Sequence, residues 1–297
     1  MQVKVYAKLN LTLGVGARVG EFHEIDSVAT SVDVCDVVEV VARTDGEVRV
    51  SGVAGVEVER NTAYRAARAF VEAFCSNGVD ICIQKGIPFG GGLGGSSADA
   101  AAVLFCMCKL FGVDVESDGV RSICTKIGSD ITYMLRGGLG RLRGKGDSVG
   151  FFSLKHPLYL ALTIFDQQMT SREVYTAFDS VVKPSRRVIN DGGTKRQFED
   201  NRSLELLNLL ADEKNEQALS CCFNDLQRAA VHVSSYADEY LKFTKSHGLN
   251  AVMTGSGSAY YVAFATVAEA QKAVDLLNSN GFTTTLCQTV PQGVEIV

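Results

Sequence analysis

The sequence Pro88-Phe89-Gly90-Gly91-Gly92-Leu93-Gly94-Gly95-Ser96-Ser97-Ala98 runs directly into an alanine-rich segment with the pattern of a helix, about 97–111. Because glycine lacks a Cβ atom, the backbone N–H groups of such a loop can approach an anion closely. The helix that follows directs its free N–H groups and the positive end of its dipole toward the loop. The stretch therefore predicts a phosphate-binding loop, in which Ser96 and Ser97 add hydroxyl contacts to phosphate or to a bound metal ion.

Three other interpretations of the same loop have to be weighed. A Walker P-loop needs Lys followed by Ser or Thr after its last glycine, and this loop has neither. The spacing of Gly90, Gly92 and Gly95 matches the dinucleotide-binding fingerprint, but a run of glycines satisfies that pattern trivially, and no acid after a second parallel strand is evident. A flexible linker would not continue at once into a strong helix former.

Upstream of the loop, residues 2–13 alternate between apolar and polar side chains. A period of two predicts a strand with one buried face, and the polar face carries Lys8 and Asn10. The glycine-punctuated segment 14–20 predicts a turn, and further strands are expected at about 36–42 and 47–51. Asn61 is a good N-cap for a helix that ends near Gly78.

In the second half of the chain, the expected strands and helices follow one another less regularly. Strands are expected at 158–164 and on both sides of Gly255-Ser256-Gly257, helices at about 203–212, 214–222, 224–246 and 268–278, and an exposed loop at 181–202. Strands and helices without a strict βαβ alternation indicate the α+β class. We expect two domains, 1–155 and 156–297.

Composition narrows the classes of partner. The net charge is -5 and the sequence pI is about 5.5, so no general attraction to nucleic acid is expected. No apolar run approaches the ~20 residues that span a bilayer. Nine cysteines without a C-x-x-C pair argue against a zinc site and against a disulfide framework. With no signal peptide evident, we expect a cytoplasmic protein.

The glycine loop resembles the second motif of the GHMP kinase superfamily. Met253–Ala259 is similar to its third motif, and Ala7–Leu11 is similar to the first motif of one branch, the 4-diphosphocytidyl-2-C-methyl-D-erythritol kinases. Further segments similar to that branch follow in the expected order: Gly20–Glu24, Asn61–Ala66, Ile127–Ile131 and Asn224–Leu226. Phe22 stands where the branch usually has Tyr, Ala98 where many members have Ser, and Lys145 at a variable place.

The resemblance implies a two-domain fold with the active site in the cleft between the domains. It implies transfer of the γ-phosphoryl group of ATP, with Mg²⁺, to the 2-hydroxyl of a diphosphocytidyl-methylerythritol substrate in the non-mevalonate route to isoprenoids. Residues 88–98 would bind ATP, with Asn61 near the adenine. Helix capping is the other interpretation of Asn61. The sequence does not identify the metal ligands or the oligomeric state.

For the chemistry, the resemblance makes Asp130 the base that accepts the hydroxyl proton and Lys8 its partner, which implies that the two lie within salt-bridge reach. From spacing alone, Asp130 serves equally well as a helix N-cap. A lysine on a strand is ordinarily a solvated surface charge. The two functional roles therefore rest on the family motif.

The resemblance assigns the substrate to a second group of residues. Phe22 and Tyr175 would stack on the cytosine, and His23 would hydrogen-bond its edge. Core packing of the aromatic rings and a turn role for the histidine are the alternatives. Asn10 would also face the substrate. Residues 255–257 either lie beside the substrate phosphates, support the glycine loop, or form a plain hairpin turn.

Three other functions compete with this assignment. Another GHMP kinase, of mevalonate or homoserine type, would use the same loop but would give Phe22 and His23 no purpose. A binding protein of the same fold that has lost turnover would not need both Lys8 and Asp130. A nicotinamide-dependent enzyme would bind NAD(H) and not ATP.

Overall fold

A computed structural model describes residues 1–297 apart from 54, 168 and 182–198. The strands are β1 (Gln2–Asn10), β2 (Thr12–Val19), β3 (Phe22–Ala42), β4 (Val48–Ser51), β5 (Val79–Gln84), β6 (Leu139–Gly144), β7 (Ser148–Phe152), β8 (Tyr159–Thr163), β9 (Phe223–Asn224), β10 (Ala251–Met253), β11 (Tyr260–Phe264), β12 (Thr284–Val290) and β13 (Val294–Ile296). The helices are α1 (Thr62–Phe74), α2 (Gly95–Phe111), α3 (Asp118–Ile127), α4 (Ile131–Arg136), α5 (Ser171–Val181), α6 (Asn201–Ala211), α7 (Asn215–Ser220), α8 (Gln227–Val233), α9 (Ser235–Ser246) and α10 (Val267–Ser279), with a 3-10 turn at Val58–Arg60.

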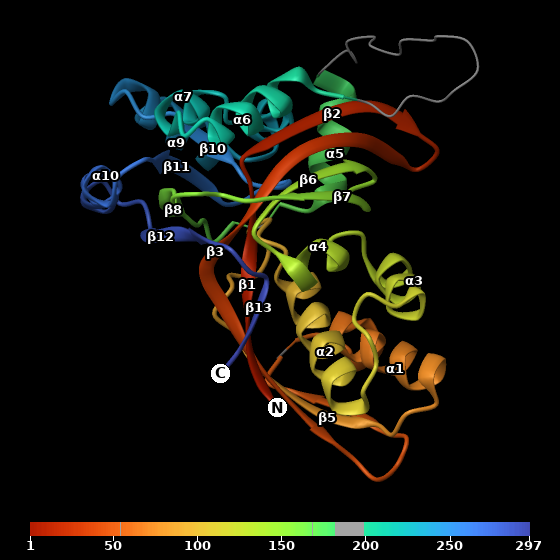
Figure 1. The fold of residues 1–297 in the computed structure, drawn as a ribbon. Coiled ribbons are helices and arrows are strands. Elements are labelled where there is room, and N and C mark those ends of the chain that lie inside the picture. The colour runs from red at the N-terminus through yellow and green to blue at the C-terminus, as the bar shows by residue number, and fades with distance from the viewer. Residues whose placement is uncertain (54, 168, 182–198) are drawn as a thin grey trace.

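The long strand β3 organises the fold. The main path of the sheet is β10-β11-β8-β12-β3-β1-β13, and β2, β5 and β6 also pair with β3. Figure 1 shows β1 and β3 running from the part of the molecule that holds α5–α9 to the part that holds α1–α4. The C-terminal strands β12 and β13 pair with β3 and β1, so both halves of the chain contribute to one sheet. The expected α+β class is observed, and the division at residue 155 stays a prediction.

Strand β1 departs from its sequence pattern in a way that matters for the site. The apolar face is buried as expected, but Tyr6, Lys8, Asn10 and Thr12 on the polar face are buried as well. Hydrogen bonds explain part of this, since Asn10 bonds to Ser27 and Thr12 to Ser203. The prediction of one buried face holds at Gln2 and Lys4, which are exposed, and is wrong from Tyr6 onward, because the pattern cannot reveal that a second layer covers the polar side there.

Three further expectations need correction. The expected strand 2–13 is interrupted at Leu11, and most of the segment 14–20 is not a turn but strand β2, which pairs with β3 up to the contact between Val19 and Phe22. The expected helix 224–246 is two helices, because Ser234 is extended, with φ -134° and ψ 123°. Of the expected loop 181–202, residues 182–198 lie outside the described part of the chain.

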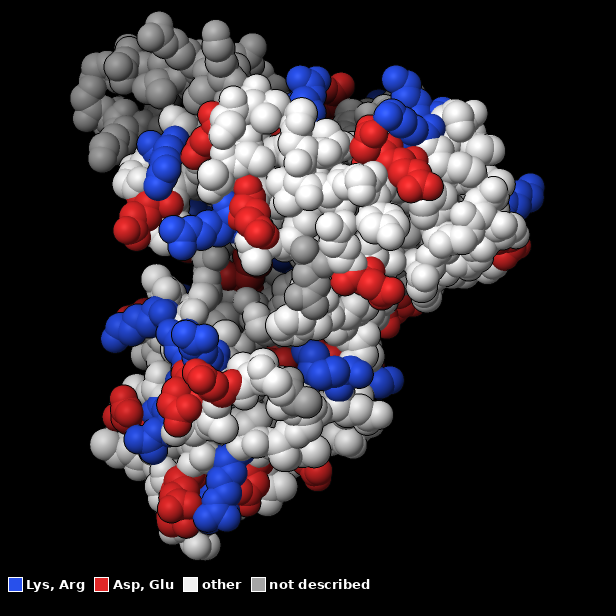
Figure 2. All heavy atoms as spheres, turned by 180° about the vertical axis from the view of Figure 1, so that it is seen from behind, with Lys and Arg blue, Asp and Glu red and all other residues white. Residues whose placement is uncertain are grey.

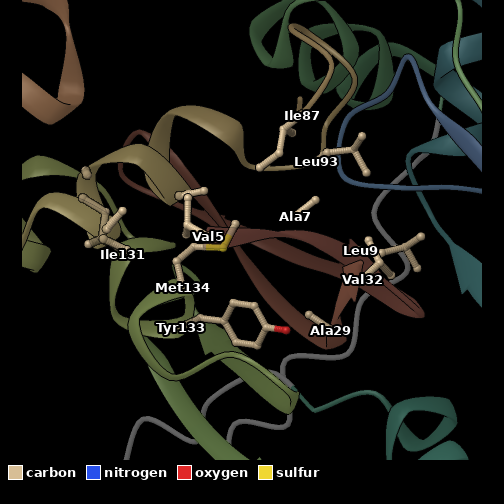
Figure 3. Packing of buried hydrophobic residues seen from close by; sticks show 14 of the residues in the cluster. Val5, Ala7, Leu9, Ala29, Val32, Ile87, Leu93, Ile131, Tyr133 and Met134 are labelled. Atoms are coloured by element: carbon tan, nitrogen blue, oxygen red, sulfur yellow. The ribbon is translucent and has the colours of Figure 1, made fainter. Parts of the chain in front are cut away.

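Apolar packing fixes the elements that carry the site. Helix α2 is buried on nearly all sides, and its alanines allow close contact with α1 and β1. Figure 3 shows Ile131 and Met134 of α4 directed toward Val5 and Ala7 of β1. All of these side chains are at most 2% exposed, and burying one large aliphatic side chain contributes ~1.5–3 kcal/mol. The start of α4 is therefore held firmly against β1.

The surface in Figure 2 is notched between its upper and lower parts. Basic and acidic side chains are mixed over this face, without a large area of one sign. Among the described residues, no helix is both long and apolar enough to cross a membrane.

Candidate active site

The glycine loop joins β5 to α2 and curls through three left-handed residues. Gly90, Gly92 and Gly94 have φ angles of 76°, 73° and 73°, and Gly94 is the N-cap residue that precedes α2. Side chains with a Cβ rarely adopt this conformation, so alternate glycines are needed here. The expected loop that enters a helix is confirmed, and the interpretation as a linker is wrong.

Two segments distant in sequence hold the loop in place. The N–H of Lys8 donates to the carbonyl of Leu93 at 2.9 Å. The N–H groups of Ser258 and Ala259 each donate across 3.2 Å, to the carbonyls of Gly90 and Gly91. The strand β1 and the turn 255–257 thus brace the loop from two sides. Two interpretations of this turn are confirmed, because it supports the loop and also joins the antiparallel strands β10 and β11 as a hairpin.

A cavity of about 410 Å³ opens on the loop. Asn61, Lys85, Phe89 and residues 90–96 are among the residues that line it. Asn61 is also the cap of α1, because its side-chain oxygen accepts from the N–H groups of Ala63 and Tyr64 at 2.9 and 3.2 Å. The capping interpretation is confirmed, while its contact with adenine stays a prediction. Thr62 donates its hydroxyl hydrogen to the carbonyl of Ser96 at 2.6 Å, which ties α1 to the loop.

The lining of this cavity includes part of a charge cluster that the sequence analysis missed. Lys85 Nζ lies 2.8 Å from Asp99 Oδ2 and also binds Asp36, whose other oxygen accepts from the N–H groups of Gly86 and Ile87. The sequence signal was a single Asp in an otherwise apolar helix. Burial raises the pKa of Asp99 to about 7, against the opposite effect of Lys85. Burial opposes the charge on Lys85, but the two carboxylates outweigh it and raise the pKa of Lys85.

Lys8 and Asp130 form an ion pair beside the loop. Their Nζ and Oδ2 atoms are 3.0 Å apart, and their side chains are 8% and 28% exposed. A Cβ atom on Gly94 would lie 3.6 Å from the Cβ of Lys8, so the loop packs directly against the lysine. The expected salt-bridge distance is confirmed.

The alternative role of Asp130 as a helix cap is not what the side chain does. Asp130 immediately precedes α4, but its carboxylate accepts no capping hydrogen bond. On its other side, a Cβ atom on Gly146 would lie 3.7 Å from Asp130 Oδ1. The carboxylate is therefore held between Lys8 and the turn 144–147, with part of its surface open.

A second cavity, of about 770 Å³, is lined by side chains from four places in the chain: Arg18, Glu21, Phe22, His23, Ile25, Lys145, Ser171, Arg172, Tyr175, Thr176 and Asp179. Phe22 is 53% exposed, so it is not a core residue. The ammonium group of Lys145 lies 4.7 Å from the centre of its ring. This wall of the cavity is an open aromatic face.

The opposite wall is formed by His23 and helix α5. The rings of His23 and Tyr175 are stacked with centroids 5.3 Å apart. His23 lies in β3 and not in a turn, so the turn interpretation was wrong. Burial raises the pKa of Tyr175 to about 12, and the charge of Asp130 adds to the effect.

Asn10 and Ser256 connect the two cavities. The side-chain oxygen of Asn10 accepts from the N–H of Gly255 at 3.2 Å, and its nitrogen donates to Ser27 at 2.7 Å. The hydroxyl of Ser256 lies 2.8 Å from that of Ser171, which lines the second cavity. The structure thus brings together the glycine loop, the ion pair and the aromatic pocket, as the sequence motifs predicted. No group of three or more acidic, His or Cys side chains suited to a metal ion occurs in the described ranges.

Comparisons with known proteins agree with this arrangement. Residues 61–139 match the family model described as "GHMP kinases N terminal domain". The 4-diphosphocytidyl-2-C-methyl-D-erythritol kinase of Desulfitobacterium hafniense (strain Y51) is 30% identical, over 99% of this chain and 97% of its own length. The enzyme of the same name from Caldanaerobacter subterraneus subsp. tengcongensis is also 30% identical, over 100% and 99%.

Solved structures give the same result. A crystal structure of a 4-(cytidine 5'-diphospho)-2C-methyl-D-erythritol kinase superposes with a TM-score of 0.75 at 25% identity, covering 98% of this chain and 100% of the other. A homoserine kinase from Cytophaga hutchinsonii superposes with a TM-score of 0.72 at 16% identity, covering 100% and 97%, which is a likeness of fold.

Proposed function

We propose a reaction for this site from the premise that the chain belongs to the 4-diphosphocytidyl-2-C-methyl-D-erythritol kinase family, within the GHMP kinases. The protein is an ATP-dependent small-molecule kinase. It phosphorylates the 2-hydroxyl group of 4-diphosphocytidyl-2-C-methyl-D-erythritol in isoprenoid precursor biosynthesis. The observation that carries the mechanism is the Lys8–Asp130 ion pair, which has the phosphate loop on one side and the turn 144–147 on the other.

The first cavity is proposed to hold ATP. Its walls suit an anionic ligand, because the loop offers backbone N–H groups at the start of α2 and glycines leave room for close approach. The residues proposed to contact the nucleotide are those of the loop and Asn61: Pro88, Phe89, Gly90, Gly91, Gly92, Leu93, Gly94, Gly95, Ser96, Ser97, Ala98 and Asn61. Mg²⁺ is proposed to accompany ATP, where it neutralises charge on the phosphate oxygens.

Asp130 is proposed to accept the proton of the substrate hydroxyl as it attacks. Its partly open carboxylate can reach a hydroxyl group while Lys8 holds it in place. The ammonium group of Lys8 stabilises the ionised carboxylate and offsets negative charge that develops on the transferred group. Burial of Lys8 strengthens both effects, because a charge acts more strongly where water is excluded.

The second cavity is proposed to hold the cytidine end of the substrate. Phe22 and Tyr175 provide aromatic faces and His23 provides ring nitrogens for the base. Asn10, Gly255, Ser256 and Gly257 are proposed to face the middle of the substrate, near the phosphate loop that they brace. The boundary between domains 1–155 and 156–297, a cytoplasmic location and the lack of a nucleic-acid partner stay predictions.

The direct test is ADP release from Mg-ATP with 4-diphosphocytidyl-2-C-methyl-D-erythritol as acceptor. Asp130→Asn removes the proton acceptor with little change in shape, and we expect turnover to fall by about 10²-fold or more. Asp118→Asn is the matched control, since Asp118 on the neighbouring helix α3 is fully exposed, and it should keep wild-type turnover.

The outcomes separate the possibilities. Turnover that survives Asp130→Asn would keep the kinase and remove Asp130 as its base. A folded wild type that phosphorylates homoserine or mevalonate instead would move the assignment to another GHMP kinase. A wild type that binds ATP and phosphorylates none of these acceptors would contradict the proposed reaction.

A further inference from the structure

One carboxylate in the second cavity has no role in the reaction described so far. Asp179 lies on α5, four residues after Tyr175, and its side chain is 37% exposed. Its Oδ1 atom lies 3.0 Å from Nε2 of His23, and its Oδ2 atom lies 3.7 Å from Arg18. Both Asp179 and His23 line the cavity, so their pair is part of the wall that a ligand meets.

The contacts of His23 fix what this pair can offer. Nδ1 lies 3.1 Å from the carbonyl oxygen of Gly16, which can only accept a hydrogen bond. Nε2 faces a carboxylate, which also accepts. The His23 ring is thus held between these two acceptors, and it fixes the position of the Asp179 carboxylate. At the cavity wall, the lone pairs of Asp179 that His23 does not engage are left to accept from a ligand.

A carboxylate acceptor at this wall matches one group on the edge of cytosine. Cytosine carries an amino group at N4, which donates. Carboxylates are the side chains that accept from N4 of cytosine in nucleic-acid recognition. We propose that Asp179, held in place by His23, is a specificity-determining residue that accepts a hydrogen bond from the cytosine amino group. This inference rests on the proposed function and adds the residue that selects the base.

Rejection of uracil follows from the same geometry. Uracil has an oxygen in place of the amino group, and that oxygen would face the carboxylate of Asp179 without a hydrogen between them. An unpaired, partly buried acceptor is what gives such sites their discrimination. Uracil could meet the pair only by sliding so that its N3–H faces Asp179. Since the far end of the substrate must reach the Lys8–Asp130 pair, that shift is opposed.

The test compares cytidine 5'-diphosphate with uridine 5'-diphosphate as inhibitors competitive against the diphosphocytidyl substrate, at saturating Mg-ATP. Competition with the substrate assigns each inhibition constant to the second cavity and not to the ATP site. We expect the wild type to prefer the cytidine compound by about 10- to 100-fold, the range of one good base contact. Asp179→Asn should reduce this preference by about tenfold or more, since an amide can donate as well as accept.

Glu21→Gln is the matched control, because Glu21 lines the same cavity and the change removes the same charge. It should leave the preference for cytidine unchanged. If Asp179→Asn lowers the affinity for both nucleotides equally, Asp179 is a positioning residue for His23 and the inference is overturned. An equal gain in affinity for both nucleotides would mean that Asp179 only fills the empty pocket, and this result would overturn the inference too.

Failure of this inference is distinct from failure of the proposed function. A wild type that phosphorylates the diphosphocytidyl substrate, yet keeps its base preference in Asp179→Asn, loses only the role of Asp179. A wild type without turnover fails the earlier test, and calorimetric titration with the two nucleotides then still measures its base preference.

Discussion

The two cavities of this protein are built from different parts of the chain. The 410 Å³ cavity contains the glycine loop, whose residues 90–96 line it with exposed backbone and are braced by hydrogen bonds from β1 and from residues 258–259. The 770 Å³ cavity is walled by side chains from β2, β3, α5 and the turn 144–147. Phosphate is the same in every nucleotide and is bound by backbone N–H groups, whereas a base must be selected by side chains.

The difference has a consequence for substitutions. In the backbone-walled cavity, an added Cβ atom is the severe change, because it collides with atoms that cannot move aside. In the side-chain-walled cavity, removal of a ring is the severe change, because contact area and stacking are lost. Each cavity should therefore be sensitive to its own kind of substitution. A substitution in one cavity should change the KM of the substrate that this cavity holds.

The largest effect is expected from Gly92→Ala. Gly92 has φ +73°, and a Cβ atom there would lie 2.5 Å from the carbonyl oxygen of Thr254 and 2.9 Å from that of Gly257. The left-handed conformation costs about 1–2 kcal/mol, and overpacking adds about 1–3 kcal/mol. We expect the free energy of unfolding to fall by about that sum, and KM for ATP to rise about tenfold as the loop shifts.

Gly281→Ala is the control for conformation alone. Gly281 has φ +84°, but no atom lies within 4 Å of a Cβ placed there. Urea unfolding should show a loss of about 1–2 kcal/mol, with KM for ATP unchanged. Equal losses in the two variants would mean that the brace from 254–257 does not hold the loop rigidly.

The same difference explains how much could be predicted from the sequence. The glycine loop and the helix after it were predicted correctly, because backbone-binding motifs are continuous in sequence and carry glycine at fixed places. The Lys8–Asp130 distance was also predicted correctly, but only through the family resemblance, since the two residues lie far apart in the sequence. The role of Asp179 was not predicted. It depends on a helix that follows His23 by about 150 residues and meets it only in the folded protein.

Burial was the other feature that the sequence pattern misjudged. Lys8 and Asn10 lie at positions that alternate with apolar residues, and alternation indicates a solvated face. They are 7% and 2% exposed, because the glycine loop and the turn at Gly255 cover that face. Asp99 was missed for a related reason, since one polar residue in an apolar helix gives no sign of Lys85 beside it.

An intermediate effect on KM is expected when one aromatic ring is removed from either cavity. Phe22 lines the second cavity and Phe89 lines the first, and both are exposed, at 53% and 72%. Loss of an aromatic platform costs about 1–3 kcal/mol per stacked base. Phe22→Ala should raise KM for the diphosphocytidyl substrate about tenfold and leave KM for ATP alone. Phe89→Ala should raise KM for ATP by a smaller factor and leave KM for the diphosphocytidyl substrate alone.

Steady-state kinetics with each substrate varied in turn measures the four KM values. Each variant serves as the control for the other, because both remove an exposed phenylalanine and neither side chain belongs to the core. If either substitution raised both KM values equally, the two cavities would act as one site, and each would not bind its own substrate separately.

The smallest expected effect is a change in the pH dependence of stability, and it arises from the cluster of Asp36, Lys85 and Asp99 at the first cavity. Burial raises the pKa of Asp99 to about 7, well above the value of about 3.9 for an unfolded chain. Between roughly pH 4 and 7 the folded protein therefore holds more protons than the unfolded one, so this carboxyl lowers the stability as the pH rises through that window. Above pH 7 both states are ionised, and the contribution becomes constant.

Asp99→Asn should remove this slope. The pKa of about 7 already includes the effect of Lys85, which lies 2.8 Å away, so we expect the difference in unfolding free energy between wild type and variant to change by about 1 kcal/mol per pH unit between pH 5 and 7. Urea unfolding at several pH values measures it as the changing difference between wild type and variant, and the exposed-residue variant Asp118→Asn should run parallel to wild type. Parallel curves for Asp99→Asn as well would mean that Asp99 is ionised throughout. Asp99 and Lys85 would then form a fully charged ion pair at every pH tested.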